Sequence, residues 1–82
     1  MKALVHVTLK PDVLDPQGEA IRKACGSLGF AGVTGVRQGK VFEIELEVDG
    51  EEEARRLLDE LAAKLLSNPV IEDHRIVSVG GD

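Results

Sequence analysis

The segment from Asp15 to Gly29 carries the start and stop signals of one helix, and this helix constrains the fold most. Asp15 is a favoured N-cap residue, because its carboxylate can accept hydrogen bonds from the free N–H groups of the first turn. Pro16 suits the first helical position, and Gly29 suits the left-handed position that follows a helix. One apolar stripe recurs along the helix at spacings typical of a buried face: Ile21, Ala24, Cys25 and Leu28. The sequence therefore predicts a helix over residues 15–28.

Gly18 is the residue of this predicted helix that disfavours helix formation. A glycine inside a helix costs about 1 kcal/mol relative to alanine. One interpretation is that the first turn tolerates a glycine at little cost. The other is that a second backbone segment approaches Gly18 too closely for a side chain to fit. The sequence supports the two interpretations equally.

Three other regions alternate apolar with polar residues, which is typical of half-buried strands: residues 2–10, 42–48 and 75–79. A second amphipathic helix begins at Asp49, which has capping-box spacing to Glu52, and ends at Ser67-Asn68-Pro69. A shorter strand is predicted over residues 33–36. Gln38-Gly39 then forms either a hairpin turn, which we favour, or a bulge within one long bent strand.

The resulting order of strands and helices, βαββαβ, is that of the ferredoxin-like fold, a two-layer α+β sandwich. In this fold two helices cover one face of a four-stranded antiparallel sheet. The alternative is a βαβαβ order with one long bent central strand. The ferredoxin-like order makes the first and third strands neighbours and brings basic side chains beside acidic ones: Lys2, His6 and Lys10 beside Glu43, Glu45 and Glu47. Residues 1–82 are predicted to form a single domain.

Size and composition point to a protein that depends on association. The chain has 82 residues, one cysteine and two aromatic residues. A chain of this size buries only about 60–65% of its unfolded surface, so a thin aliphatic core without disulfides favours oligomerisation or docking on a larger partner. The net charge of −5 disfavours binding to nucleic acid. No apolar run approaches the roughly 20 residues of a membrane span, and no signal-peptide pattern is present, so we expect a cytoplasmic protein that binds no membrane.

No constellation of catalytic residues can be recognised in the sequence. Cys25 lies on the apolar stripe of the first helix, which indicates a small core residue rather than a nucleophile. His6 and His74 have no further metal ligands at a recognisable spacing. No glycine-rich phosphate loop is present. The sequence therefore indicates a non-catalytic module with no cofactor or metal of its own.

Three segments have an order and spacing that are specific in combination. The first is Leu14-Asp15-Pro16-Gln17-Gly18 with Ala20-Ile21, the second runs from Leu28-Gly29-Phe30 to Gly39-Lys40, and the third is Asn68-Pro69-Val70-Ile71-Glu72-Asp73. This combination resembles the PurS family, the small subunit of phosphoribosylformylglycinamidine (FGAM) synthase. The resemblance covers nearly the whole chain. His74 departs from it, because an aromatic residue such as Tyr is common there.

The resemblance implies a place in a multi-subunit ligase of de novo purine biosynthesis. In this family a glutaminase subunit (PurQ) releases ammonia from glutamine, and a synthetase subunit (PurL) uses ATP and Mg to aminate formylglycinamide ribonucleotide. The small subunit holds no catalytic group or cofactor. It forms a homodimer or tetramer and bridges the other two subunits for ammonia transfer. The implied candidates for contact with a partner subunit are Asp15, Gln17, Gly18, Arg37, Gly39, Lys40, Asn68 and Pro69.

An alternative function from another class is a regulatory domain of the same βαββαβ type. Such a domain would bind an amino acid or a nucleotide between protomers. A thermal shift assay with a panel of metabolites separates the two functions, since a ligand at about 100 times its Kd adds about 2.7 kcal/mol of stability.

Overall fold

The computed structural model describes residues 1–80, and its elements follow the order strand, helix, strand, helix, strand. The elements are β1 (Lys2–Leu9), α1 (Pro16–Ser27), β2 (Gly39–Glu45), α2 (Glu51–Leu61), the short π-helix η1 (Ala62–Leu66) that continues α2, and β3 (Glu72–Gly80). Residues 81 and 82 of the predicted domain lie outside the described residues. Within the described part, every helix is too short or too polar to cross a membrane.

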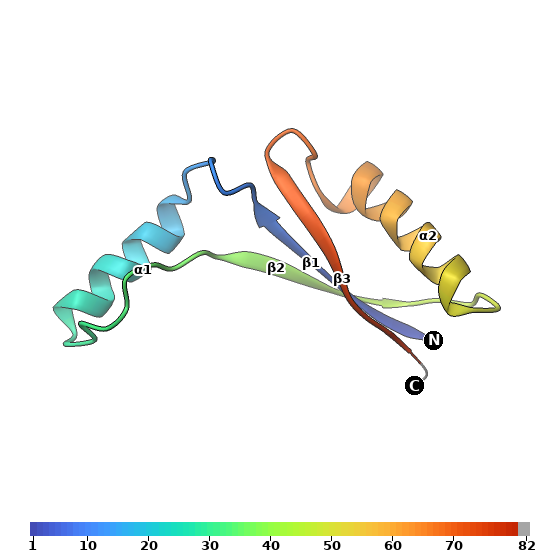
Figure 1. The fold of residues 1–82 in the computed structure, drawn as a ribbon, viewed down its shortest axis with the longest axis horizontal. Helices are drawn as coiled ribbons and strands as arrows, with labels where there is room; N and C mark the ends of the chain where they lie inside the picture. Colours follow the sequence, from blue (N-terminus) through green and yellow to red (C-terminus); the bar gives the residue numbers. More distant parts are fainter. Residues whose placement is uncertain (81–82) are drawn as a thin grey trace.

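The sheet has three antiparallel strands in the order β2-β1-β3, with β1 in the centre (Figure 1). On the face that α2 covers, Val5 lies opposite Phe42 of β2 and Ile76 of β3. On the open face, Lys2 lies opposite Glu45. The prediction that the first strand neighbours the glutamate-bearing strand is therefore confirmed.

The predicted charge complementarity on the open face is only partly present. His6 lies opposite Val41 rather than a glutamate. The ammonium group of Lys10 contacts the carboxylate of Asp73 at 2.6 Å, from the strand on the other side. The prediction was wrong for these two basic residues, because β2 begins at Gly39 and does not extend far enough to lie beside Lys10.

The hydrophobic core lies between the central strand and α2. The buried apolar residues alternate along β1 and recur on one face of the helix: Ala3, Val5, Val7, Ala54, Leu58 and Ala62. Half-buried residues from the flanking elements surround them: Phe42, Ile44, Leu46, Leu66, Ile76 and Val79. The alternation that predicted the first strand identifies core positions, and the stripe predicted for the second helix does so at Ala54 and Leu58 but not at Leu57 and Leu65, which are exposed.

The ends of α1 agree with the prediction. Asp15 is the N-cap, and its carboxylate accepts a hydrogen bond of 3.0 Å from the N–H of Gly18. Gly29 follows the helix in the left-handed region, with φ at 92°. The N–H of Phe30 donates to the carbonyl of Cys25 at 2.8 Å, which satisfies one of the last free carbonyls of the helix.

The segment between α1 and β2 differs from the prediction. Residues 33–36 form no strand and Gln38-Gly39 forms no hairpin turn, so the middle of the fold has one strand where the predicted βαββαβ order has two. The N–H of Gln38 donates instead to the carboxylate of Asp15 at 2.7 Å, 23 residues earlier in the sequence, and is not available to a strand partner. The ferredoxin-like α+β class is nevertheless confirmed, in the βαβαβ order of the alternative.

The prediction for the second helix was wrong at its start and correct at its end. Gly50 is the N-cap of α2 and no side chain caps the helix, so the predicted capping box of Asp49 and Glu52 is wrong. Asp49 lies one residue too early to reach the first turn. The stop at Ser67 is confirmed, since the N–H of Ser67 closes the last π-helical turn on the carbonyl of Ala62 at 2.9 Å.

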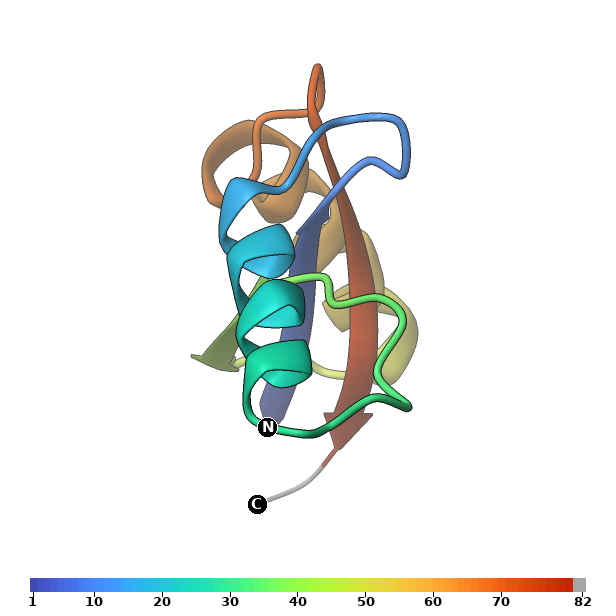
Figure 2. The ribbon, with the colours of Figure 1, turned by 90° about the vertical axis from the view of Figure 1, so that its left-hand side faces the viewer.

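Residues 16–38, which we call the arm, extend away from the sheet, whereas α2 packs against it (Figure 1). Figure 2, viewed from the side of the arm, places α1 in front and α2 behind the strands. The radius of gyration is 15.9 Å, against about 12 Å for a compact chain of this length. Gly18 is the only buried residue of α1. The prediction of Cys25 as a core residue is therefore wrong within one chain, where this thiol is only half-buried.

Candidate functional site

Asp15 forms the centre of the junction between the arm and the sheet. Its side chain accepts hydrogen bonds from the N–H of Gly18 at 3.0 Å and from the N–H of Gln38 at 2.7 Å. The residue is only 7% exposed. The bond from Gln38, helped by the bond from Gly18 and by the charge of Arg37, lowers the pKa of Asp15 below its ordinary value of 3.8. Asp15 is thus a carboxylate that joins two segments distant in the sequence.

Gly18 lies where the returning segment of the arm approaches α1. A Cβ atom built on Gly18 would overlap the carbonyl oxygen of Val36 and lie 2.7 Å from a carboxylate oxygen of Asp15. Real Cβ atoms do not approach other atoms this closely, and the oxygen of Val36 belongs to the backbone, so a side chain at Gly18 would force a backbone segment to shift. The second interpretation of Gly18, a close approach of another backbone, is therefore confirmed.

Arg37 holds the same junction from the opposite side. Its guanidinium donates to the carbonyl oxygens of Leu9 at 3.2 Å, Lys10 at 2.8 Å and Val13 at 3.2 Å. These carbonyls belong to the end of β1 and the loop after it. Hydrogen bonds from a charged donor are worth more than neutral ones. We call the group of Asp15, Gly18, Val36, Arg37 and Gln38 the clasp.

Beside the clasp lies an open hollow of about 450 Å³ between the end of β1, the start of α1 and the start of β2. Four of the residues predicted as contacts with a partner line it: Asp15, Gln17, Gly39 and Lys40. Gly39 has no room for a side chain, since a Cβ there would lie 2.7 Å from the Cγ2 of Thr8. The lysine side chain is 62% exposed at the rim.

Glu72 connects the hollow to the corner between η1 and β3. One oxygen of its carboxylate lies 3.7 Å from the Nζ of Lys40, and the other accepts a hydrogen bond of 2.7 Å from the N–H of Asn68. Asn68 in turn accepts from the N–H of Val70 at 3.1 Å, which shapes the turn that contains Pro69. Sequence reasoning did not single out Glu72, because a carboxylate at the first position of a strand has no distinguishing signal.

The structure thus places the eight predicted contact residues near one end of the sheet, where β1 ends and β2 and β3 begin. In Figure 1 the loop after β1 and the corner before β3 lie side by side at this end, and the N–H of Lys10 donates to the carbonyl of Ile71 at 2.8 Å. Within the group, Asp15, Gly18 and Arg37 are bound inside the chain as parts of the clasp. The side chain of Lys40 is more available for an outside contact.

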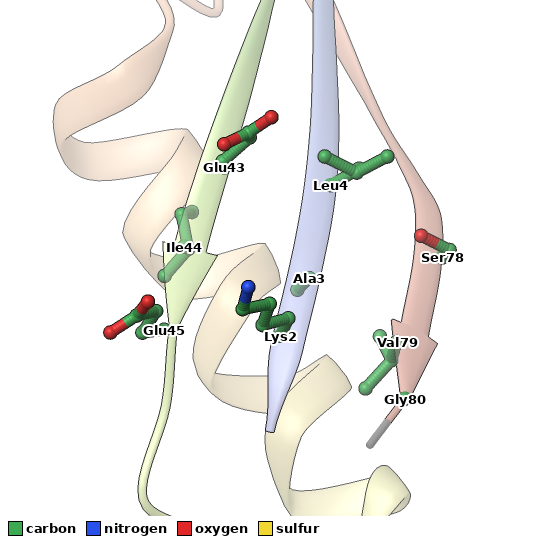
Figure 3. A pocket seen from close by; sticks show the side chains of 9 residues that line it. All are labelled: Lys2, Ala3, Leu4, Glu43, Ile44, Glu45, Ser78, Val79 and Gly80. Carbon is green, nitrogen blue, oxygen red and sulfur yellow. The ribbon is translucent and has the colours of Figure 1, made fainter. Parts of the chain in front are cut away.

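A second open hollow, of about 510 Å³, lies at the opposite end of the sheet (Figure 3). Lys2 lies there between β2, which carries Glu43 and Glu45, and β3, which carries Ser78. One cation and two carboxylates on an open surface lack the enclosure of a small-molecule site. This hollow therefore gives little support to the alternative function, a regulatory domain that binds an amino acid or a nucleotide.

Residues 1–80 show no arrangement of side chains suited to metal binding or to nucleophilic catalysis. These residues contain no group of three or more His, Cys, Asp or Glu side chains that could hold a metal ion. His74 contacts Asp59 of α2 at 3.0 Å, on the covered side of the sheet, whereas His6 lies on the open face. Cys25 lies on the arm, away from both histidines. The described residues thus define a small α+β module of the kind that serves as a subunit of an assembly.

Comparison with known proteins identifies the assembly. Residues 2–80 match the family described as PurS, phosphoribosylformylglycinamidine (FGAM) synthase, and the chain belongs to this family. It is 49% identical over 77 residues to the phosphoribosylformylglycinamidine synthase subunit PurS of Mycobacterium leprae, covering 92% of this chain and 91% of that protein. It is thus a subunit of a ligase of purine biosynthesis.

Solved structures give the same result. The crystal structure of PurS from Methanocaldococcus jannaschii is similar with a TM-score of 0.84 and 41% identity, over 92% of this chain and 90% of that one. It is described as one of the subunits of formylglycinamide ribonucleotide amidotransferase in the purine biosynthetic pathway. A chain in the structure of PurLQS from Thermotoga maritima is similar with a TM-score of 0.83 and 26% identity, over 96% of this chain and 99% of that one.

Proposed function

We propose that this chain bridges the glutaminase subunit PurQ and the synthetase subunit PurL, and thereby helps ammonia pass from one to the other. The observation that carries the proposal is the likeness of nearly the whole chain to a chain in the Thermotoga maritima PurLQS structure. ATP, Mg and glutamine are then bound by the other subunits. This chain contributes surfaces rather than chemistry, and its action in the cytoplasm stays a prediction.

The bridging form of the chain is a homodimer joined through the arm. The arm exposes large apolar side chains that a lone protein would bury, among them Leu28 at 74% and Phe30 at 58% exposure. The sheet offers a matching surface, because Phe42 and Ile44 on the face covered by α2 remain only half-buried. A ferredoxin-like sheet carries two helices on this face, and one chain places only α2 there. The α1 of a second copy supplies the other helix.

The eight residues at the clasp and its hollow are the proposed contact region for PurQ or PurL. Lys40 is the strongest member, since its ammonium group is largely exposed and its ion pair with Glu72 is long, at 3.7 Å. Asn68 and Pro69 present a rigid turn beside it. The partners of this region would carry carboxylates opposite the lysine.

The test is a pair of initial rates, with glutamine or ammonium chloride as the nitrogen source, measured with and without this chain. A bridge between two active sites should raise glutamine-dependent synthesis far more than ammonia-dependent synthesis, because free ammonia reaches the synthetase by diffusion. Equal stimulation of both rates would mean that the chain acts on the synthetase itself. No stimulation of either rate, with partners of verified activity, would remove the proposal.

A further inference from the structure

We propose that the clasp is a positioning device that fixes the angle between the arm and the sheet, so that two copies can close on each other. This inference rests on the proposed pairing through the arm. Asp15, Gly18 and Arg37 are its positioning residues. Their role goes beyond holding one chain together, because the direction of the arm decides what a second copy meets.

The clasp joins the two connections that lead to and from the arm. The outgoing connection follows β1 and ends at Asp15. The returning connection is the last part of the arm, residues 36–38, which leads into β2. The side chain of Asp15 binds the backbone of the returning connection at Gln38. The side chain of Arg37, on the returning connection, binds backbone carbonyls of the outgoing one. Each connection is thus held by a side chain of the other.

Among residues 1–80, α1 has no close packing against any strand of the sheet. Gly18, within the clasp, is the only buried residue of α1, and the helix has no packed layer against the sheet of its own chain. Without the clasp, each connection would be a single backbone pivot. Because the two connections are hydrogen-bonded to each other, they instead hold the arm at one angle to the sheet.

The angle matters because of the length of the arm. A helix of 12 residues is roughly 18 Å long, so a tilt of about 10° moves its far end by about 3 Å. A shift of that size removes the close contacts on which apolar packing depends. A closed symmetric dimer also requires that each copy present the same geometry to the other. A loose joint would therefore weaken pairing even though every apolar residue of the interface remained.

Gly18 allows a matched test. In Gly18→Ala the new methyl group would collide with Val36 and force the connections apart. In Gly26→Ala, on the same helix, nothing lies within 4 Å of the added Cβ. Asp15→Asn replaces one acceptor oxygen of the clasp by a donor, and Asp12→Asn, at an exposed position in the preceding loop, is its control.

The measurements are the dimer dissociation constant from sedimentation equilibrium, the radius of gyration from small-angle scattering, and helix content from circular dichroism. We expect Gly18→Ala and Asp15→Asn to raise the dissociation constant at least about tenfold with the helix content retained. Gly26→Ala and Asp12→Asn should match the unmodified chain. A merely structural role would lower the unfolding midpoint and leave the dissociation constant of the folded molecules unchanged.

Two outcomes overturn the inference in different ways. A chain that is monomeric at all accessible concentrations overturns the proposed pairing itself. A dimeric chain whose Gly18→Ala and Asp15→Asn variants keep its dissociation constant and scattering profile overturns the clasp inference alone. If either variant fails to fold, Arg37→Gln distinguishes between these two outcomes. The side chain of Arg37 is exposed, and this substitution removes its hydrogen bonds to the outgoing connection.

Discussion

The carboxylate of Asp15 accepts a hydrogen bond of 2.7 Å from the N–H of Gln38, so the residue that begins α1 also holds the segment that returns from it. The same carboxylate accepts from the N–H of Gly18, where the carbonyl of Val36 leaves no room for a side chain. The consequences can be measured separately.

The stability of the chain should fall in acid through Asp15. Its hydrogen bonds lower the pKa of the folded state below 3.8, so the unfolded state binds a proton more readily. The stabilisation is complete at pH values above the unfolded pKa and is lost as the pH falls through the folded one. The unfolding temperature of Asp15→Asn should therefore depend less on pH in this range than that of Asp12→Asn. Parallel curves for the two variants would contradict the assignment.

Alanine at the two glycines of α1 should have opposite effects on stability. Gly18→Ala introduces a collision and should cost about 1–3 kcal/mol, the usual range for overpacking. Gly26→Ala meets open space and should gain about 0.5–1 kcal/mol from helix propensity. Urea unfolding at equal protein concentration measures both. The idea fails if the two variants are equally stable.

Charge on the apolar side of the arm should dissociate the dimer. Leu28 is 74% exposed in one chain and Leu65 on η1 is 75% exposed, so Asp at either position costs a single chain little. Burial of a leucine in an interface is worth about 1.5–3 kcal/mol, and only Leu28→Asp should lose it. Sedimentation equilibrium should show monomers for Leu28→Asp and dimers for Leu65→Asp. The reverse pattern would place the interface on η1.

Lys40 should contribute to assembly with the other subunits through its charge. Lys40→Gln should weaken binding, and the affinity of the unmodified chain should fall with salt more steeply than that of the variant. Lys64→Gln is the control, since Lys64 is also exposed and paired with Glu60 on α2. Titration of each chain into its partners at two ionic strengths measures how steeply its affinity falls with salt. Equal slopes would exclude an ionic contact at this position.

Cys25→Ala should leave the glutamine-dependent rate of the reconstituted complex unchanged. The thiol lies half-buried on the arm. We expect a loss of dimer stability of about 1 kcal/mol, because a small apolar group is removed from the pairing surface. A variant that assembles normally and yet loses turnover would show a chemical role for the thiol.

Local signals in the sequence were sufficient for much of this fold. The limits of α1 follow from Asp15, Pro16 and Gly29, which act on neighbouring residues only. The alternation along β1 identified its buried side in the same way. Short-range chemistry of this kind can be recognised from a few adjacent residues.

The wrong predictions have a common physical origin. The strand expected over residues 33–36 was lost to a contact between Asp15 and Gln38, which are 23 residues apart. Cys25 is on an apolar stripe, but its helix does not pack on the sheet of its own chain. Gly18 was recognised as unusual, yet the segment that approaches it could not be named. Glu72 was missed because its partners, Lys40 and Asn68, are brought together only by the completed sheet.

The position of β1 in the middle of the sheet also governs how the chain can acquire its structure during synthesis. Lys2 pairs with Gly80, so the central strand is made first and its second neighbour last. At about 5–20 residues per second, a nascent chain carries β1 without its second neighbour for roughly 4–14 s before β3 is complete. Until then the core residues of β1 lack the cover that Ile76 and Val79 of β3 provide in the finished core. Such a high contact order predicts slow folding and a need for protection by chaperones at the ribosome.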